Sequence, residues 1–167
     1  MAGVSPELLG RLVDDHAAAL VLYARQWCAA PEDVVQEAFL KLAQQLSVPD
    51  NPAGWLYRVV RNGAISAARS TRRRRRHEGL AAARAPAWFI AEASALDAEA
   101  ATAALQELPV EQREIIVAHL WGGLSFEQIA ELVGTSPSTA HRWYTAGLTS
   151  LRERLGVPCP SKPTIRN

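Results

Sequence analysis

The sequence is poor in residues that cross-link a chain or hold a metal. Only two of its 167 residues are cysteines, and neither Cys28 nor Cys159 has a second cysteine or a cluster of histidines near it. A disulfide framework and a zinc site are therefore not indicated, and a reducing compartment fits. The four histidines are scattered, there is no glycine-rich phosphate loop, and no Ser/His/Asp arrangement or metal-ligand spacing appears. We expect no metal, no cofactor and no enzymatic activity.

Long apolar runs are absent as well. No window approaches the roughly 18 apolar residues of a membrane span, and the N-terminus has no basic segment followed by an apolar one. We therefore expect a cytoplasmic protein that is neither exported nor inserted into a membrane. Glycine and proline number only 10 each, while 49% of the residues are hydrophobic. Few helix breakers and ample apolar material predict an all-α fold with packed cores.

What the chain does have is a concentrated positive charge. Its net charge is only +1, but the segment between Asp50 and Glu78 holds eight arginines and no acidic residue. Five of these arginines are consecutive, from Arg72 to Arg76. Such a block favours a polyanionic partner, and the consecutive arginines are best interpreted as a tail that neutralises phosphates.

Three amphipathic helices are predicted in the first half of the chain. The first spans residues 5–28, and the second begins at Pro31 and continues to Leu46, with acidic residues at its N-terminal end, where the helix dipole favours them. Two prolines in residues 48–52 then predict a stiff loop. The third helix follows, with apolar residues on its inner face and arginines on its outer face.

A linker separates this half from the next. Residues 77–104 are rich in alanine and lose the helical period, although Trp88, Phe89 and Ile90 within them are expected to dock on a domain. We therefore predict two small helical domains, residues 1–76 and 105–160, joined by this linker.

The second domain contains a predicted helix-turn-helix. Ser125 and Gln128 form a capping box at the start of a helix to Val133, Gly134 supplies a left-handed turn, and Pro137 starts a longer helix to about Leu155. In DNA-binding proteins the second helix of this unit enters the major groove. Five residues near its start are candidates for DNA contacts, and only the last is a strong base reader: Ser136, Ser138, Thr139, His141 and Arg142.

The first domain indicates which kind of DNA-binding protein this is. Its order is Glu-Asp-Val-Val-Gln-Glu-Ala-Phe-Leu at residues 32–40, the proline loop, Trp-Leu-Tyr-Arg-Val-Val-Arg-Asn at residues 55–62 and the arginine run. With this order the chain resembles the extracytoplasmic-function sigma factors of bacteria. Residues 32–40 resemble sigma region 2.2, residues 55–76 resemble regions 2.3 and 2.4, and residues 105–155 resemble region 4.

The resemblance implies a sigma factor that binds core RNA polymerase and directs promoter recognition, DNA melting and transcription initiation. The implied polymerase contacts are Asp33, Gln36, Glu37, Phe39, Leu40 and Lys41. The implied contacts to the minus-10 element, as duplex and as melted non-template strand, are Asn51, Arg58, Arg61, Asn62, Ser66 and Arg69. The five helix-turn-helix residues would contact the minus-35 element. An anti-sigma factor is a possible further partner, and the free chain is expected to be a monomer.

The sequence leaves several alternatives open. The exposed face of the second helix could be an ordinary solvated face, and Asn51 could equally be a turn residue before Pro52. Core packing is preferred over base stacking for Trp55. Trp143 and Tyr144 stand where relatives often carry basic residues, which leaves the strength of minus-35 binding open. For the whole chain, the competing hypothesis is a free-standing, dimeric helix-turn-helix regulator, which leaves residues 31–76 unexplained.

Overall fold

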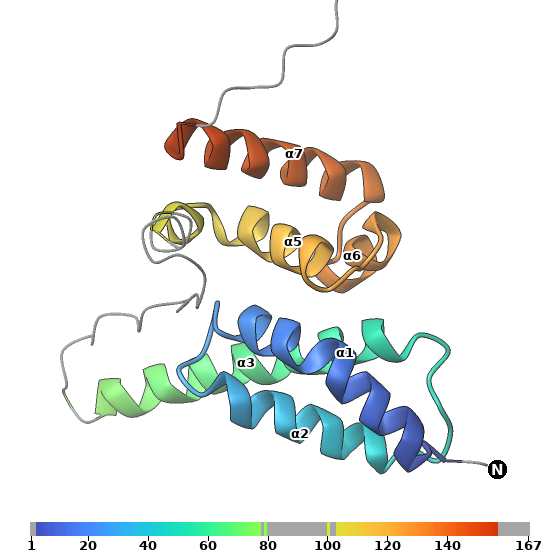
Figure 1. Ribbon diagram of the computed structural model, residues 1–167. Helices are drawn as coiled ribbons and strands as arrows, with labels where there is room; N and C mark the ends of the chain where they lie inside the picture. The colour runs from blue at the N-terminus through green and yellow to red at the C-terminus, as the bar shows by residue number, and fades with distance from the viewer. Residues whose placement is uncertain (1–2, 78, 80–99, 101–102, 157–167) are drawn as a thin grey trace, which may run out of the picture.

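The computed structural model describes residues 3–77, 79, 100 and 103–156 (Figure 1). The regular elements of these residues are α-helices, which confirms the all-α prediction. Most of the predicted linker lies outside the described residues, including Trp88, Phe89 and Ile90, and so does Cys159.

The first three helices form what we call the N-terminal bundle: α1 (Pro6–Ala24), α2 (Pro31–Ala43) and α3 (Pro52–His77). The Ser5 side chain caps α1 by accepting a hydrogen bond from the Leu8 amide, which satisfies one of the free donors at a helix start. The three helices pack around fully buried side chains that their amphipathic patterns had placed inward, namely Leu20, Leu42, Leu56 and Val60.

The predicted extension of α2 to Leu46 is wrong. The helix ends at Ala43, and Leu46 is 78% exposed. The Gln45 side chain turns back and donates a hydrogen bond to the Lys41 carbonyl, 3.2 Å away. This bond satisfies one of the carbonyls that a helix end leaves free, so α2 can stop before the stiff loop that the two prolines impose.

The arginine run is part of α3. Arg72 to Arg76 lie in its last turns, and this end of α3 extends beyond α1 and α2 (Figure 1). Positive side chains near a helix C-terminus interact favourably with the helix dipole. The arginines are therefore displayed on a rigid helix.

The C-terminal bundle, as we call it, consists of α5 (Val110–Leu120), α6 (Phe126–Val133) and α7 (Pro137–Arg154), preceded by a short helical stretch at residues 103–106. The predicted capping box of Ser125 and Gln128 is present, and Gly134 adopts a φ of 77° at the turn into α7. An L side chain rarely adopts this conformation, so glycine is needed there. The helix-turn-helix prediction is confirmed.

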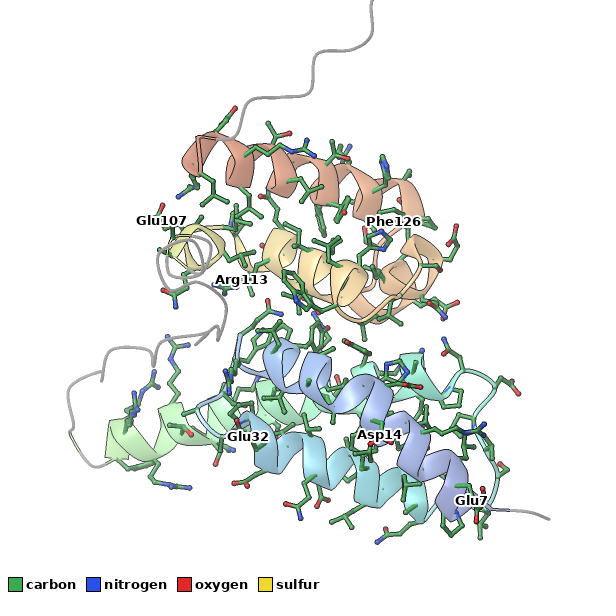
Figure 2. The ribbon with its side chains drawn as sticks, viewed as in Figure 1. Glu7, Asp14, Glu32, Glu107, Arg113 and Phe126 are labelled. Carbon is green, nitrogen blue, oxygen red and sulfur yellow. The ribbon has the colours of Figure 1, made fainter. Side chains whose placement is uncertain are left out.

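An aromatic cluster holds this bundle together. Phe126 lies where α5, α6 and α7 meet (Figure 2). Its ring stacks on His119 at a centroid distance of 4.5 Å and meets His141 edge-on at 5.0 Å. The Nδ1 atom of His119 lies 2.7 Å from the Leu124 carbonyl oxygen. His119 is thus a packing residue.

The two bundles are stacked rather than separate. The C-terminal bundle covers one side of the N-terminal bundle (Figure 1), with α5 against α1 and α6 against α3. Their buried apolar residues form one continuous cluster. The sequence predicted two domains on a linker, but it did not predict that they share a core. None of the described helices is long and apolar enough to span a membrane.

Candidate functional surfaces

One face of α2 carries most of the predicted polymerase contacts. Asp33, Gln36, Glu37, Leu40 and Lys41 are all exposed, and their spacing places them along a single side of the helix. Leu40 is 51% exposed, an apolar side chain within a polar surface. Glu37 and Lys41 form an ion pair of 3.5 Å one turn apart.

Phe39 differs from the other members of this predicted set. It is only 9% exposed and belongs to the core. It supports the α2 face from beneath instead of forming part of the surface. The sequence could not separate Phe39 from Leu40, because two adjacent apolar residues fit a helical stripe almost equally well.

A cationic stripe follows the outer side of α3. Its residues recur every three or four positions and therefore share one helix face: Arg58, Asn62, Ser66, Arg69, Arg73 and Arg76. Toward the C-terminal end of the helix the stripe borders a hollow of about 480 Å³ lined by Ser66, Arg69, Arg72, Arg73 and Arg76. A rigid row of guanidinium groups of this kind suits the regular phosphates of a nucleic acid.

Arg61 lies beside the stripe, but it is already engaged. Its side chain is 26% exposed, and its Nε atom lies 2.6 Å from Oε1 of Glu114 in α5. A second bond of 3.4 Å joins Nη2 to Oε2, so the guanidinium grips the carboxylate with two donors. The guanidinium carbon also lies 6.0 Å from the Trp27 ring centroid. Burial acts to lower the pKa of Arg61, but the bond and charge of Glu114 outweigh it and raise that pKa.

Glu114 is the buried acid of this contact. It is 3% exposed, and its Oε1 atom also accepts a 2.5 Å hydrogen bond from the Tyr23 hydroxyl in α1. Burial, reinforced by the negative charge of Glu114, raises the pKa of Tyr23 well above its ordinary value. The tyrosine therefore remains a donor at every physiological pH, and the carboxylate is satisfied by two residues of the other bundle.

The proline loop before α3 lies against the C-terminal bundle. Asn51 Oδ1 accepts a 3.0 Å hydrogen bond from the Gly54 amide at the start of α3. Arg58 and Glu131 of α6 form an exposed ion pair of 3.9 Å. The proline loop, the start of α3 and α6 border a hollow of about 310 Å³. It is lined by Pro49, Asp50, Asn51, Gly54, Trp55, Arg58, Gln128, Glu131 and Leu132.

The start of α7 presents the predicted minus-35 residues together. Ser136 caps the helix by accepting from the Thr139 amide at 3.2 Å, and its hydroxyl also bonds Thr139 Oγ1 at 2.9 Å and Ser138 Oγ at 3.1 Å. His141 and Arg142 are exposed beyond them. Arg142 is the cation of a shallow surface that ends at Glu153, so this surface carries little net charge. Trp143 and Tyr144 pack against the core.

The sequence marks Arg61 as a candidate contact but does not mark its partners. Glu114 stands in the run Glu-Ile-Ile-Val-Ala, where α5 is buried. A single acid within such a run is the signal that could have marked it, because an ionised carboxylate is rarely buried without a partner. Nothing in the sequence links it to Tyr23 or Arg61.

Comparison with known proteins identifies the family. The Sigma-70 region 2 family model matches residues 12–74, and the Sigma-70 region 4 model matches residues 98–151. The chain belongs to the sigma-70 family. The N-terminal bundle carries region 2 and the C-terminal bundle carries region 4, which is the organisation of the extracytoplasmic-function group.

A curated sigma factor agrees with this assignment. The chain is 32% identical over 160 residues to the probable RNA polymerase sigma factor RfaY of Xanthomonas campestris pv. campestris, and the match covers 87% of this chain and 40% of that protein. The chain therefore spans less than half the length of this curated relative.

Two solved structures share the fold across both regions. The sigma factor RpoE, solved with the anti-sigma factor NepR from Bartonella quintana, matches with a TM-score of 0.69 at 25% identity, over 93% of this chain and 100% of that one. CnrH, solved with the cytosolic domain of CnrY, matches with a TM-score of 0.61 at 23% identity, over 93% and 92% of the two chains.

Proposed function

We propose that this chain is a sigma factor that binds core RNA polymerase in the bacterial cytoplasm, directs it to promoters and helps to melt them, without a catalytic activity of its own. Residues 1–76 would bind polymerase and the minus-10 element, residues 105–160 would bind the minus-35 element, and residues 77–104 would connect them. The observation that carries the proposal is the pairing of two surfaces on adjacent helices, an acidic and amide-bearing face on α2 and a cationic stripe on α3.

The α2 face would dock on polymerase. Asp33, Gln36, Glu37 and Lys41 offer carboxylates, an amide and an amine around the exposed Leu40. Such a surface complements a partner helix that presents arginines around apolar side chains. Phe39 would act by holding this face in shape.

The α3 stripe and the adjacent Arg61 would bind the promoter near the minus-10 element. Arg58, Arg61 and Arg69 would contact phosphates, while Asn62 and Ser66 would bond base edges or sugars of the displaced strand. Asn51 is the candidate for holding an unstacked base, although its side chain also caps α3.

Region 4 would contribute modest DNA affinity. With Arg142 as its strong base reader and hydroxyl groups at Ser136, Ser138 and Thr139, α7 offers few charged contacts to the minus-35 element. Two weak DNA readers held on one polymerase gain effective concentration and become jointly specific. An anti-sigma factor, such as the NepR bound to the solved RpoE, is the expected regulatory partner.

The proposal can be tested by co-elution of the full chain with sigma-free core polymerase in size-exclusion chromatography. We expect a one-to-one complex that is lost in Asp33→Lys/Glu37→Lys. The matched control is Asp14→Lys/Asp15→Lys, which reverses two exposed acids on α1 and should leave the complex intact; Asp14 is labelled in Figure 2. If the wild-type chain never joins core polymerase yet binds duplex DNA as a dimer, the free-standing regulator replaces the sigma factor.

A further inference from the structure

The contact between the two bundles is centred on Glu114. This carboxylate belongs to the C-terminal bundle and is 3% exposed. Its hydrogen bonds come from the N-terminal bundle: Tyr23 Oη at 2.5 Å, Arg61 Nε at 2.6 Å and Arg61 Nη2 at 3.4 Å. A buried carboxylate is stable only when it is paired. The position of one bundle on the other therefore determines whether Glu114 can remain buried.

This contact withholds residues proposed to bind DNA. Arg61 is paired with Glu114, and Arg58 is paired with Glu131 of α6. Asn51 lines the hollow that α6 closes from the other side. Three of the six proposed minus-10 residues thus face acids or side chains of region 4. Farther along α3, Ser66, Arg69, Arg73 and Arg76 border a different hollow, lined by α3 alone.

Two features of the contact outside its shared apolar core lower the free-energy cost of opening it. When a buried ion pair separates and both charges enter water, the net change in free energy is small, because hydration of the charges replaces their mutual attraction. The fully buried Tyr57 adds a cost to the closed form. It packs against Gly122 of the other bundle, and its hydroxyl has no hydrogen-bond partner in the described structure. Opening would let water bond this hydroxyl.

We propose that Glu114 is a latch that holds the free sigma factor in a closed, self-inhibited form. In this form acids of region 4 pair with Arg58 and Arg61 of the minus-10 surface. These arginines are therefore masked without a second protein. Binding to core polymerase separates the two regions, exposes Arg58 and Arg61 and leaves Glu114 to water. This inference rests on the proposed function, whereas the latch itself is a property of the chain alone.

The latch can be tested with Glu114→Gln, which keeps the side-chain shape and removes its charge. The matched control is Glu111→Gln, the same change at an exposed acid three residues earlier on α5. Spin labels at Ala43→Cys on α2 and Thr149→Cys on α7, in a Cys28→Ser/Cys159→Ser background, report the separation of the bundles by pulsed electron paramagnetic resonance. Circular dichroism establishes that each full-length variant is folded.

We expect one narrow distance distribution in the wild type and in Glu111→Gln, and a longer, broader one in Glu114→Gln. If only the open form binds core polymerase, the apparent affinity falls in proportion to the fraction of chains that are open. Glu114→Gln raises this fraction and should therefore bind core polymerase at least about tenfold more tightly than the wild type. Tyr23→Phe should give a smaller change in the same direction, which guards against a folding defect specific to one variant.

The possible failures are distinguishable. An unchanged distance distribution in Glu114→Gln would overturn the latch, whatever happens with polymerase. Opening without any gain in polymerase affinity would overturn the inhibitory role. If neither the wild type nor the open variant binds polymerase, the proposed function fails and the inhibitory role fails with it, while the distances still decide the latch.

Discussion

Tyr23 and Glu114 are 91 residues apart in the sequence, yet the hydroxyl of one donates a 2.5 Å hydrogen bond to the carboxylate of the other. Beside this pair, the Tyr57 ring lies 5.0 Å from the Tyr23 ring and is equally buried, but its hydroxyl has no hydrogen-bond partner in the described structure. Of these two neighbouring tyrosines, Tyr23 therefore stabilises the interface with a hydrogen bond, whereas Tyr57 places an unsatisfied hydroxyl in it.

The two tyrosines predict opposite effects of the same substitution. Tyr23→Phe removes a bond to a buried charge and should lower the free energy of unfolding by about 1.5–3 kcal/mol. Tyr57→Phe removes a hydroxyl without a partner and should be neutral or stabilising. Urea unfolding of the two variants beside the wild type measures both effects. Equal losses in the two variants would contradict the bonding pattern.

Alkaline pH should weaken the fold through the same residues. Burial raises the pKa of Tyr23, with Glu114 adding to the effect, and burial raises the pKa of Tyr57 as well. In the unfolded chain both tyrosines ionise near pH 10, so above this pH the unfolded state binds fewer protons than the folded state. The free energy of unfolding must then fall as pH rises.

Urea midpoints recorded from neutral pH to beyond the ordinary tyrosine pKa test this prediction. The double variant Tyr23→Phe/Tyr57→Phe, compared by slope and not by absolute stability, should show a shallower decline than the wild type. An identical slope would mean that other groups cause the loss.

Gly122 is expected to tolerate no side chain. A methyl group built there would lie 2.5 Å from the Ala118 carbonyl oxygen and 2.6 Å from Cζ of Tyr57. Gly122→Ala should therefore cost about 1–3 kcal/mol, as overpacking of a core does, and should loosen the contact between the bundles. Gly10→Ala is the control, because its methyl group would meet nothing within 4 Å and should stabilise α1 by about 0.4–1 kcal/mol. Thermal unfolding distinguishes them.

Asn51 has two proposed roles that substitutions can separate. Its Oδ1 atom accepts from the Gly54 amide at the start of α3, and aspartate can do the same. Asn51→Ala should cost about 0.5–2 kcal/mol, whereas Asn51→Asp should retain most of the stability. If the amide also bonds a base, both variants should lose promoter-directed transcription with core polymerase. Full transcription by Asn51→Asp would reduce Asn51 to a helix cap.

Local features of the fold could be predicted because they depend on short segments. Ser5, the Ser125 and Gln128 pair, and Gly134 mark helix ends through contacts within a few residues. The α2 face and the α3 stripe follow from helical spacing alone. The premature end of α2 escaped prediction because Leu46 continues the apolar period, while the proline loop and the Gln45 side chain end the helix earlier.

The contact between the bundles could not be predicted in this way. Arg61 was recognised as a basic residue on an outer helix face, and it is such a residue within the N-terminal bundle alone. Its partner is 53 residues away, and no local pattern encodes which acid of the second bundle it meets. The electrostatic state of the candidate DNA surface therefore became visible only in three dimensions.

The pairing of Arg58 and Arg61 with region 4 also affects how this protein should respond to salt. When an unpaired arginine contacts a DNA phosphate, it releases a cation that was condensed on the DNA. For each such phosphate, the logarithm of the binding constant falls by about 0.9 for a tenfold rise in salt concentration. Arg58 and Arg61 must instead leave Glu131 and Glu114, and those carboxylates then attract cations from solution. In the closed chain, Glu131 and Glu114 act as the counterions of these two arginines. The DNA affinity of the chain should therefore depend less steeply on ionic strength than its number of arginines suggests.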